Sequence, residues 1–309
     1  MKQGFYPNIS HEDYHADEFG IDQPTLSSSM VKILLAKSPK HAWGSHPKLG
    51  NKITPDTSKA MDIGSAAHDL IAGDPDKIVY VDAPSWAHKA PAYGQKASLV
   101  RAELREQGKI AMLESDREPL AEMVQAIAAQ CALLPEDARP LNGGCHEGTL
   151  FWYEGDIPCK ARPDWCDPNG PELLWDWKIG DTAKPQAFKK QIANMQYDVS
   201  RSWYLRGARK VFGWRNPEMY FLRVESAWPY SMSVNSINRQ WGDVADRKID
   251  HALRIWSECM TLNHWPAYKN KVYEHEMPNW AYYDWEEVEN AESAGEGVLK
   301  SAYDWQKPL

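Results

Sequence analysis

The segment Leu173–Ile179 limits the fold of this chain more than any other, because two charged residues interrupt an otherwise apolar run. The apolar residues are leucine, tryptophan and isoleucine, and the sequence Asp-Pro-Asn-Gly before the run is typical of a turn. These features predict a buried strand in the middle of a sheet. Since burial of charge is costly, Asp176 and Lys178 are expected to serve a purpose there.

Two further strands are predicted directly before this one, over residues 147–153 and 157–166. Short turn sequences separate the three segments, so we expect an antiparallel three-stranded meander. Other strands are predicted over residues 78–81, 219–224 and 231–234, and helices over residues 25–43, 60–72, 95–107, 115–131, 184–195, 197–212 and 238–262. The order of these elements predicts an α/β fold with a central mixed sheet flanked by helices.

The chain has 309 residues, of which 43% are apolar, and can therefore bury a sizeable core. We expect three parts, namely an N-terminal arm and helix (1–59), a core (60–262) and a Trp-rich acidic tail (263–309). Residues 1–24 are expected to form an extended arm. Residues 284–296 are expected to be loosely ordered or to depend on a partner.

The composition indicates a soluble cytoplasmic protein. No apolar run approaches the roughly 18 residues that span a bilayer, and the N-terminus lacks a signal-peptide pattern. Five scattered cysteines without a C-x-x-C pair favour reduced thiols over a structural zinc site. The net charge of −8 does not exclude a nucleic-acid partner, because residues 271–309 contribute nine acidic residues against three lysines.

Alternate side chains of a strand point to the same face, so Asp176 and Lys178 share one face of the predicted central strand. The tryptophans beside them face the opposite, buried side. Asp164 arrives at hairpin distance on the preceding strand, and Glu147 can reach the same face from the first strand. Three carboxylates and one lysine are therefore expected to converge. In the competing interpretation, the aspartates lie at strand ends and Lys178 pairs with one of them.

Carboxylates packed this closely repel one another unless a cation neutralises them. A hard divalent cation with oxygen ligands meets this need, and Mg²⁺ is the usual ion at phosphates. We expect two Mg²⁺ ions, with Mn²⁺ as a substitute, because ions about 3.5–4 Å apart can activate water and stabilise a leaving oxygen. Lys178 would add positive charge at the developing phosphorane or the attacking water.

The residues Pro163-Asp164 and Asp176-Trp177-Lys178 resemble the signature of the PD-(D/E)xK nuclease superfamily. Other segments resemble the RecE (exonuclease VIII) branch of that superfamily, and this resemblance extends over residues 5–260. These segments are residues 64–68 (GSAAH), 146–152 (HEGTLFW), 159–165 (CKARPDW) and 197–205 (YDVSRSWYL).

The resemblance implies a restriction-endonuclease-like core and a Mg²⁺-dependent exodeoxyribonuclease that acts on the ends of linear double-stranded DNA. It implies degradation in the 5′-to-3′ direction, which leaves 3′ overhangs for recombination and repair by strand annealing. It also implies a bacterial or phage-encoded cytoplasmic protein. The implied partners are DNA ends, further copies of the chain in a trimeric or tetrameric ring, and a single-strand annealing protein. No membrane partner is expected.

The resemblance also assigns roles to individual residues. Glu147, Asp164 and Asp176 correspond to metal ligands, together with the main-chain carbonyl of Trp177. Lys178 corresponds to the catalytic lysine. His68, on the predicted helix 60–72, corresponds to a further metal or phosphate contact. Gly64, one turn before that histidine, is expected to let the helix approach the sheet.

One position departs from the family pattern. Ser200 stands where the family usually has a glutamine, four residues before the helix residue Tyr204. Gln196 lies one turn earlier and is the candidate replacement in contacting DNA. The basic residues Lys189, Lys190 and Arg201 on residues 184–212 are further DNA-binding candidates. An ordinary solvated helix face is the alternative explanation for each of them.

Two other functions are compatible with the sequence. The first is a catalytically silent protein that keeps the fold and binds DNA ends or takes part in assembly. The second is a zinc metalloprotease, because His11-Glu12-x-x-His15 matches the H-E-x-x-H pattern. That pattern requires a helix with both histidines on one face and a third ligand. Pro7 and Ser10 precede the motif, so a chance match in the arm is the competing interpretation.

Overall fold

The computed structural model describes residues 1–53, 59–136, 139–140 and 143–294. The chain forms two compact units, Met1–Ala267 and Tyr268–Leu309. Within the described ranges, no helix is long and apolar enough to cross a membrane.

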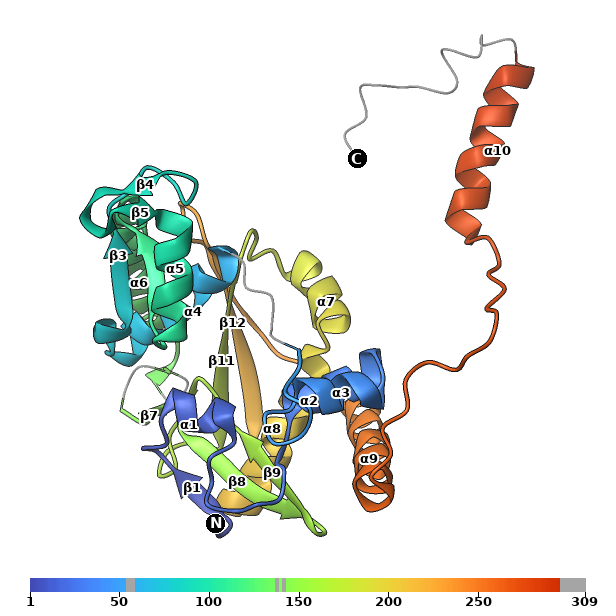
Figure 1. Ribbon diagram of the computed structural model, residues 1–309, viewed down its shortest axis with the longest axis horizontal. Coiled ribbons are helices and arrows are strands. Elements are labelled where there is room, and N and C mark those ends of the chain that lie inside the picture. Colours follow the sequence, from blue (N-terminus) through green and yellow to red (C-terminus); the bar gives the residue numbers. More distant parts are fainter. Residues whose placement is uncertain (54–58, 137–138, 141–142, 295–309) are drawn as a thin grey trace. The chain divides into compact units, whose positions relative to one another are not determined.

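A five-stranded mixed sheet forms the centre of the first unit (Figure 1). Its strand order is β13-β12-β11-β10-β7. The strands are β7 (Cys145–His146), β10 (Trp165–Cys166), β11 (Leu173–Gly180), β12 (Glu218–Glu225) and β13 (Met232–Asn235). β11 and β12 run parallel, whereas the other neighbours are antiparallel. The predicted α/β fold with a central mixed sheet is therefore confirmed.

A second sheet takes up parts of the predicted meander. It contains β1 (Gly4–Tyr6), β8 (Thr149–Glu154), β9 (Ile157–Ala161) and β2 (Leu26–Ser27), in the order β1-β8-β9-β2. The expectation of three continuous strands in one meander is wrong. The first predicted strand (147–153) lies in this second sheet as β8, the second (157–166) is divided between the sheets as β9 and β10, and the third lies in the five-stranded sheet as β11. Glu147, with φ of +51°, lies where the chain passes from β7 to β8, and Pro163 lies where it passes from β9 to β10. A left-handed residue and a proline both interrupt the pairing of a strand.

Helices cover both faces of the five-stranded sheet. Trp175 and Trp177 pack in one cluster with α4 (Lys59–Ala72) and α6 (Arg117–Cys131). Leu174 and Phe221 pack in another cluster on the opposite face. That face is covered by α2 (Ser28–Ala36), α7 (Pro185–Asn194), α8 (Tyr197–Phe212) and α9 (Arg239–Leu262). The predicted alternation along β11 is therefore confirmed, since its tryptophans point away from the side of Leu174.

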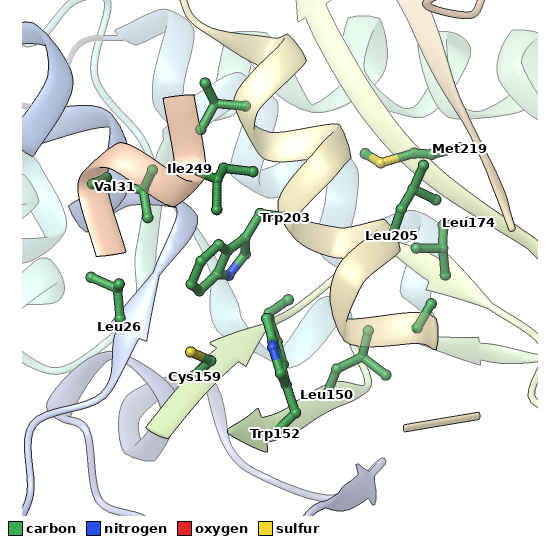
Figure 2. Close-up of a cluster of buried hydrophobic side chains, with 14 of the residues drawn as sticks. Leu26, Val31, Leu150, Trp152, Cys159, Leu174, Trp203, Leu205, Met219 and Ile249 are labelled. Atoms are coloured by element: carbon green, nitrogen blue, oxygen red, sulfur yellow. The ribbon is translucent and has the colours of Figure 1, made fainter. Parts of the chain in front are cut away.

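The larger core cluster joins the two sheets to the helices (Figure 2). Trp152 of β8 and Trp203 of α8 are fully buried there, and their ring centroids are 5.1 Å apart. Gly207 of α8 lies over Trp152, where an added Cβ would come within 2.8 Å of the indole ring. α8 can therefore approach β8 closely only because it carries a glycine at this position.

The smaller elements complete the first unit. They are the parallel pair β3 (Ile78–Val81) and β6 (Ile110–Leu113), the hairpin β4 (Lys89–Ala90) and β5 (Gln95–Lys96), helix α5 (Ala97–Glu106), and the 3₁₀ turns η1 (Pro75–Lys77), η2 (Pro91–Tyr93) and η3 (Glu114–Asp116). Their buried residues form a cluster of their own around Val81, Val100 and Leu113.

Three local expectations are corrected. The single helix predicted over residues 25–43 is two helices, α2 and α3 (Pro39–Ser45), because Pro39 starts a new helix after Ser38. The N-terminal arm is not wholly extended, since it contains β1 and α1 (His11–Ala16). The expectation that residues 284–296 are loosely ordered is also wrong for 284–293, because these residues lie in α10 (Asn279–Ser293). Residues 295–296 are outside the described residues.

Candidate functional site

The acidic motif residues lie where the two sheets separate. Glu147 follows β7, and its N–H donates a hydrogen bond to the carbonyl oxygen of Asp164 at 3.1 Å. Asp164 follows Pro163 and directly precedes β10. Both carboxylates therefore project from a bend, where the main chain has left one sheet and is entering the other.

The strand register places the three predicted carboxylates in one row. Trp165 pairs with Trp175 on β11 and with His146 on β7. Continuing this antiparallel register by one residue sets Asp164 opposite both Asp176 and Glu147. Residues in such a row lie on the same face of a sheet. The main chain of Asp164 therefore lies beside that of both residues, and the Asp164 carboxylate also accepts a hydrogen bond from the Trp177 N–H.

Lys178 lies on the same face of β11 as Asp176, two residues further along the strand. Its ammonium group forms an ion pair with the Asp176 carboxylate and donates a hydrogen bond to the Trp177 carbonyl oxygen at 3.0 Å. Burial lowers the pKa of Lys178, and the nearby Asp164 carboxylate opposes this effect. A lysine that is already within reach of the carboxylates can serve as a fixed positive charge at the site.

His68 approaches this row from α4. Its Nδ1 lies 3.6 Å from an oxygen of Asp164, so the helix histidine belongs to the same site. The reason expected for Gly64 is wrong, since a Cβ added there would meet no described atom within 4 Å. The short residues that let α4 pack closely are instead Ala66 and Ala67, which are fully buried.

A cavity of about 210 Å³ opens beside His68 and Glu147. Asp69 lines it, and one carboxylate oxygen of Asp69 is buried without a hydrogen-bond partner among the described residues. Burial raises the pKa of Asp69 to about 6. Glu12 and Lys77 also line the cavity. The cavity thus contains one buried carboxylate oxygen that lacks a donor.

The H-E-x-x-H segment forms helix α1, so the interpretation of this segment as an extended arm is wrong. The Ser10 side chain accepts a hydrogen bond from the Asp13 N–H and caps the helix. The rings of His11 and His15 are 4.2 Å apart, as expected for positions one turn apart on one face. His11 and Glu12 line the same cavity as Glu147. α1 therefore forms one wall of the candidate site.

Arg162 joins α1 to the acidic row. Its guanidinium group donates hydrogen bonds to the carbonyl oxygens of Ile9 and Ser10, just before the helix. It also lies over the ring of Tyr14 and 3.9 Å from a carboxylate oxygen of Glu147. The arginine before the Pro-Asp motif therefore positions Glu147 and the N-terminal helix relative to each other.

The donor types of the row are those that a hard divalent cation takes. Carboxylate oxygens of Glu147, Asp164 and Asp176 and the carbonyl oxygen of Trp177 are the ligand types that Mg²⁺ prefers. Within the described ranges, no three His, Cys, Asp or Glu side chains are arranged closely enough to hold a metal as they stand. The ion pair of Lys178 with Asp176 and the hydrogen bond of Trp177 to Asp164 engage the same oxygens. A bound cation would have to displace these contacts.

The candidate DNA-binding residues do not form one surface. Tyr204 is partly buried near Asp164 and Ser28, whereas Ser200 is buried in the core. Gln196 precedes α8 with φ of +51°, and its amide oxygen has no hydrogen-bond partner among the described residues. The remaining candidates are the exposed α7 residues Lys189 and Lys190 and the partly buried α8 residue Arg201, which lines a different cavity.

The prediction from sequence missed Lys32 of α2. Its ammonium group lies 5.3 Å from the centre of the Tyr197 ring, and that of Lys178 lies 5.2 Å from the same centre. Burial, reinforced by Lys178, lowers the pKa of Lys32 to about 7. The signal was present, because Lys32 is the only charged residue within the apolar segment Ser28–Ala36.

Comparison with known proteins shows the family and the fold of the chain. Residues 27–275 match a protein family described as PDDEXK-like domain of unknown function (DUF3799). The fold is similar to the crystal structure of a presumed exonuclease from Eubacterium rectale, with a TM-score of 0.56 and 12% sequence identity over 89% of this chain and 98% of that chain. No curated protein matches the sequence. The chain therefore belongs to the PDDEXK-like family of unknown function (DUF3799), and its fold is that of the PD-(D/E)xK nuclease superfamily.

Proposed function

We propose that this protein is a Mg²⁺-dependent exodeoxyribonuclease that acts on the ends of linear double-stranded DNA. The observation that carries the proposal is the row in which Asp164 lies opposite both Glu147 and Asp176, with Lys178 on the same face. Such a set of hard oxygen donors beside a cationic side chain suits hydrolysis of a phosphodiester.

Each residue of the row has a task in this reaction. Glu147, Asp164, Asp176 and the Trp177 carbonyl would hold two Mg²⁺ ions, which supply water activation and stabilisation of the leaving oxygen when bound. Lys178 would leave Asp176 and place its charge against the scissile phosphate. His68, within 3.6 Å of Asp164, would contact either the metal or the phosphate.

Lys32 extends the phosphate contacts of the site. The described part of the chain gives its ammonium group no carboxylate within ion-pair distance, and Tyr197 lies beside both lysines. Two ammonium groups against one tyrosine ring offer a strand of DNA two neighbouring phosphate contacts.

The direction and purpose of the reaction follow from the RecE-like resemblance. We infer 5′-to-3′ degradation that leaves 3′ overhangs, which a single-strand annealing protein would then use in recombination. The description of the similar Eubacterium rectale protein as a presumed exonuclease supports the choice of exonuclease over endonuclease.

Nucleotide release from linear duplex DNA tests the activity. We expect release with Mg²⁺ or Mn²⁺ and none with a chelator, because the carboxylates alone cannot activate water. Asp164→Ala and Lys178→Met should each lower the rate by about 100-fold or more. Lys89→Met, at an exposed lysine of β4, is the matched control and should leave the rate unchanged. Equal rates in all variants would show that the proposed site does not catalyse the reaction.

Substrates labelled at one end test the direction. Early release of a 5′ label from blunt duplex, with covalently closed circles left intact, is the expected pattern. Early release of a 3′ label would reverse the proposed polarity. Cleavage of closed circles would instead indicate an endonuclease.

A catalytically silent DNA-end-binding protein is the second candidate. It is favoured by the ion pair between Lys178 and Asp176, which engages a carboxylate that the reaction needs, and by the buried Ser200 at the usual glutamine position. Binding of duplex ends without nucleotide release in Mg²⁺ or Mn²⁺ would support this candidate. The metalloprotease is not retained, because the family and the fold of the chain are PDDEXK-like.

A further inference from the structure

A second cavity, of about 580 Å³, lies between α8, the start of β12 and the first turns of α9. It shares no lining residue with the cavity at His68. It lies near Glu218, which pairs with Leu173, whereas Lys178 pairs with Arg223 towards the other end of the same strands. The two cavities are therefore separate features of the first unit.

Three arginines line this second cavity, namely Arg201 and Arg209 of α8 and Arg239 of α9. Among the described residues, none of them has a carboxylate within ion-pair distance. Two acids of the lining have other partners, since Asp246 pairs with Arg206 and Glu218 accepts a hydrogen bond from the Tyr220 hydroxyl. The remaining acid, Asp243, is exposed. The acids of the lining therefore balance the arginines at a distance, but none of them forms an ion pair with an arginine of the cavity.

Arg201 is the anchor of this arrangement. Its Nε is buried and has no hydrogen-bond partner among the described residues. Its Nη1 lies against α9 at Gly242, where an added Cβ would come within 3.2 Å. A glycine in the middle of a helix costs stability, and so does a buried N–H group without a hydrogen-bond partner. The fold nevertheless holds this side chain in a fixed place beside the cavity.

We propose that the cavity lined by Arg201, Arg209 and Arg239 binds a phosphate group. The planar guanidinium fork matches phosphate oxygens in a bidentate geometry, and the unpartnered Nε of Arg201 supplies a donor that such an oxygen satisfies. The phosphate belongs either to a mononucleotide or to a strand of DNA. This choice of nucleic acid rests on the proposed function, whereas the anion site itself rests on the arginines alone.

Binding to the full chain in the presence of a chelator, which prevents hydrolysis, tests the proposal. The probes are inorganic phosphate, deoxyadenosine monophosphate and a single-stranded oligonucleotide, titrated by calorimetry. Arg209→Ala and Arg239→Ala change exposed side chains and should each weaken binding about tenfold or more. Gly242→Val displaces Arg201 without removing it and should have the same effect, provided that circular dichroism shows an unchanged fold. Arg254→Ala, at an exposed arginine of α9 outside the cavity, is the matched control.

The probes distinguish the source of the phosphate. Weaker binding of phosphate and the mononucleotide identifies a product or effector site, whereas weaker binding of the oligonucleotide alone identifies a strand contact. Unchanged affinity for every probe overturns the proposal. So does an altered oligomeric state with unchanged affinity, which would assign the arginines to an acidic protein segment. Wild-type protein that binds phosphate through these arginines but never degrades DNA would refute the proposed nuclease function alone.

Discussion

At the scale of single residues, the proposed site includes Lys32, which shares the ring of Tyr197 with Lys178. We expect Lys32→Met to lower kcat/KM for DNA degradation by about tenfold or more, through loss of a phosphate contact. Lys32→Arg should restore part of the rate. Lys37→Met, at the exposed end of α2, is the control. An unchanged rate for Lys32→Met would leave Lys178 as the sole lysine of the site.

The low pKa of Lys32 adds a dependence on pH. Burial lowers this pKa to about 7, so the charge of Lys32 is complete below that pH and is lost above it. Since kcat/KM reports the free enzyme, the ratio of wild type to Lys32→Met should fall as the pH rises through about 7. A ratio that is constant from pH 6 to pH 9 would contradict this assignment.

His46 links stability to pH at the same scale. It is buried, its Nε2 donates to the Thr25 carbonyl at 2.9 Å, and its Nδ1 accepts from the Lys48 N–H at 3.2 Å. Burial lowers the pKa of His46, and the Thr25 bond and Asp17 oppose this effect. The folded state therefore keeps a neutral imidazole under conditions in which the unfolded chain binds a proton.

Stability should consequently fall as the pH drops below the ordinary histidine pKa of about 6.5. The loss continues down through the lowered folded-state pKa. His46→Gln should flatten this dependence, although it also lowers stability at neutral pH. Urea unfolding between about pH 7.5 and pH 5 measures the slope. His264→Gln, at an exposed site, should keep the wild-type slope, and an equal slope in both variants would exclude His46 as its source.

At the scale of elements, the packing of α8 on β8 depends on Gly207. A Cβ there would approach the ring of Trp152, which is fully buried against Trp203 and cannot retreat. Gly207→Ala should therefore destabilise the protein by about 1–3 kcal/mol, despite the higher helix propensity of alanine.

Gly64 of α4 is the matched control for that substitution. No described atom lies within 4 Å of a Cβ added at Gly64, so Gly64→Ala should stabilise by about 0.5–1 kcal/mol. Denaturant midpoints of the two variants give the comparison. Shifts of the same sign would show that close packing does not govern the α8–β8 contact.

The whole molecule consists of two compact units. The second unit exposes large apolar side chains, namely Tyr268, Val272, Tyr273, Met277, Trp280, Tyr282, Tyr283 and Trp285. Exposed apolar groups in such number are typical of a contact surface. We propose that this segment joins copies of the chain into the ring that the RecE-like resemblance implies.

Truncation after Ala267 tests the role of the second unit. The shortened chain should keep the unfolding midpoint of the first unit, because the core clusters end at Trp265. Full-length protein should be a trimer or tetramer by light scattering, whereas the truncated chain should be a monomer. A monomeric full-length protein at micromolar concentration would refute the ring. An oligomer that survives truncation would place its contacts in the first unit.

The sequence alone determined the elements whose signals are local. Apolar periodicity predicted α8 over residues 197–212 and α6 to within two residues, and alternation along β11 predicted the opposite faces of Asp176 and Trp177. Turn chemistry placed Asp164 at hairpin distance from Asp176. These features depend on neighbours within a few residues, so the local sequence is enough to predict them.

Only the tertiary structure decided how distant segments meet. It divided the predicted meander between two sheets at Glu147 and Pro163, brought α1 against the acidic row, and set Lys32 beside Lys178. It also placed Arg201 at a second cavity, which is separate from the cavity at His68. Such contacts join residues far apart in sequence, and their free energy comes from packing that no short segment can specify.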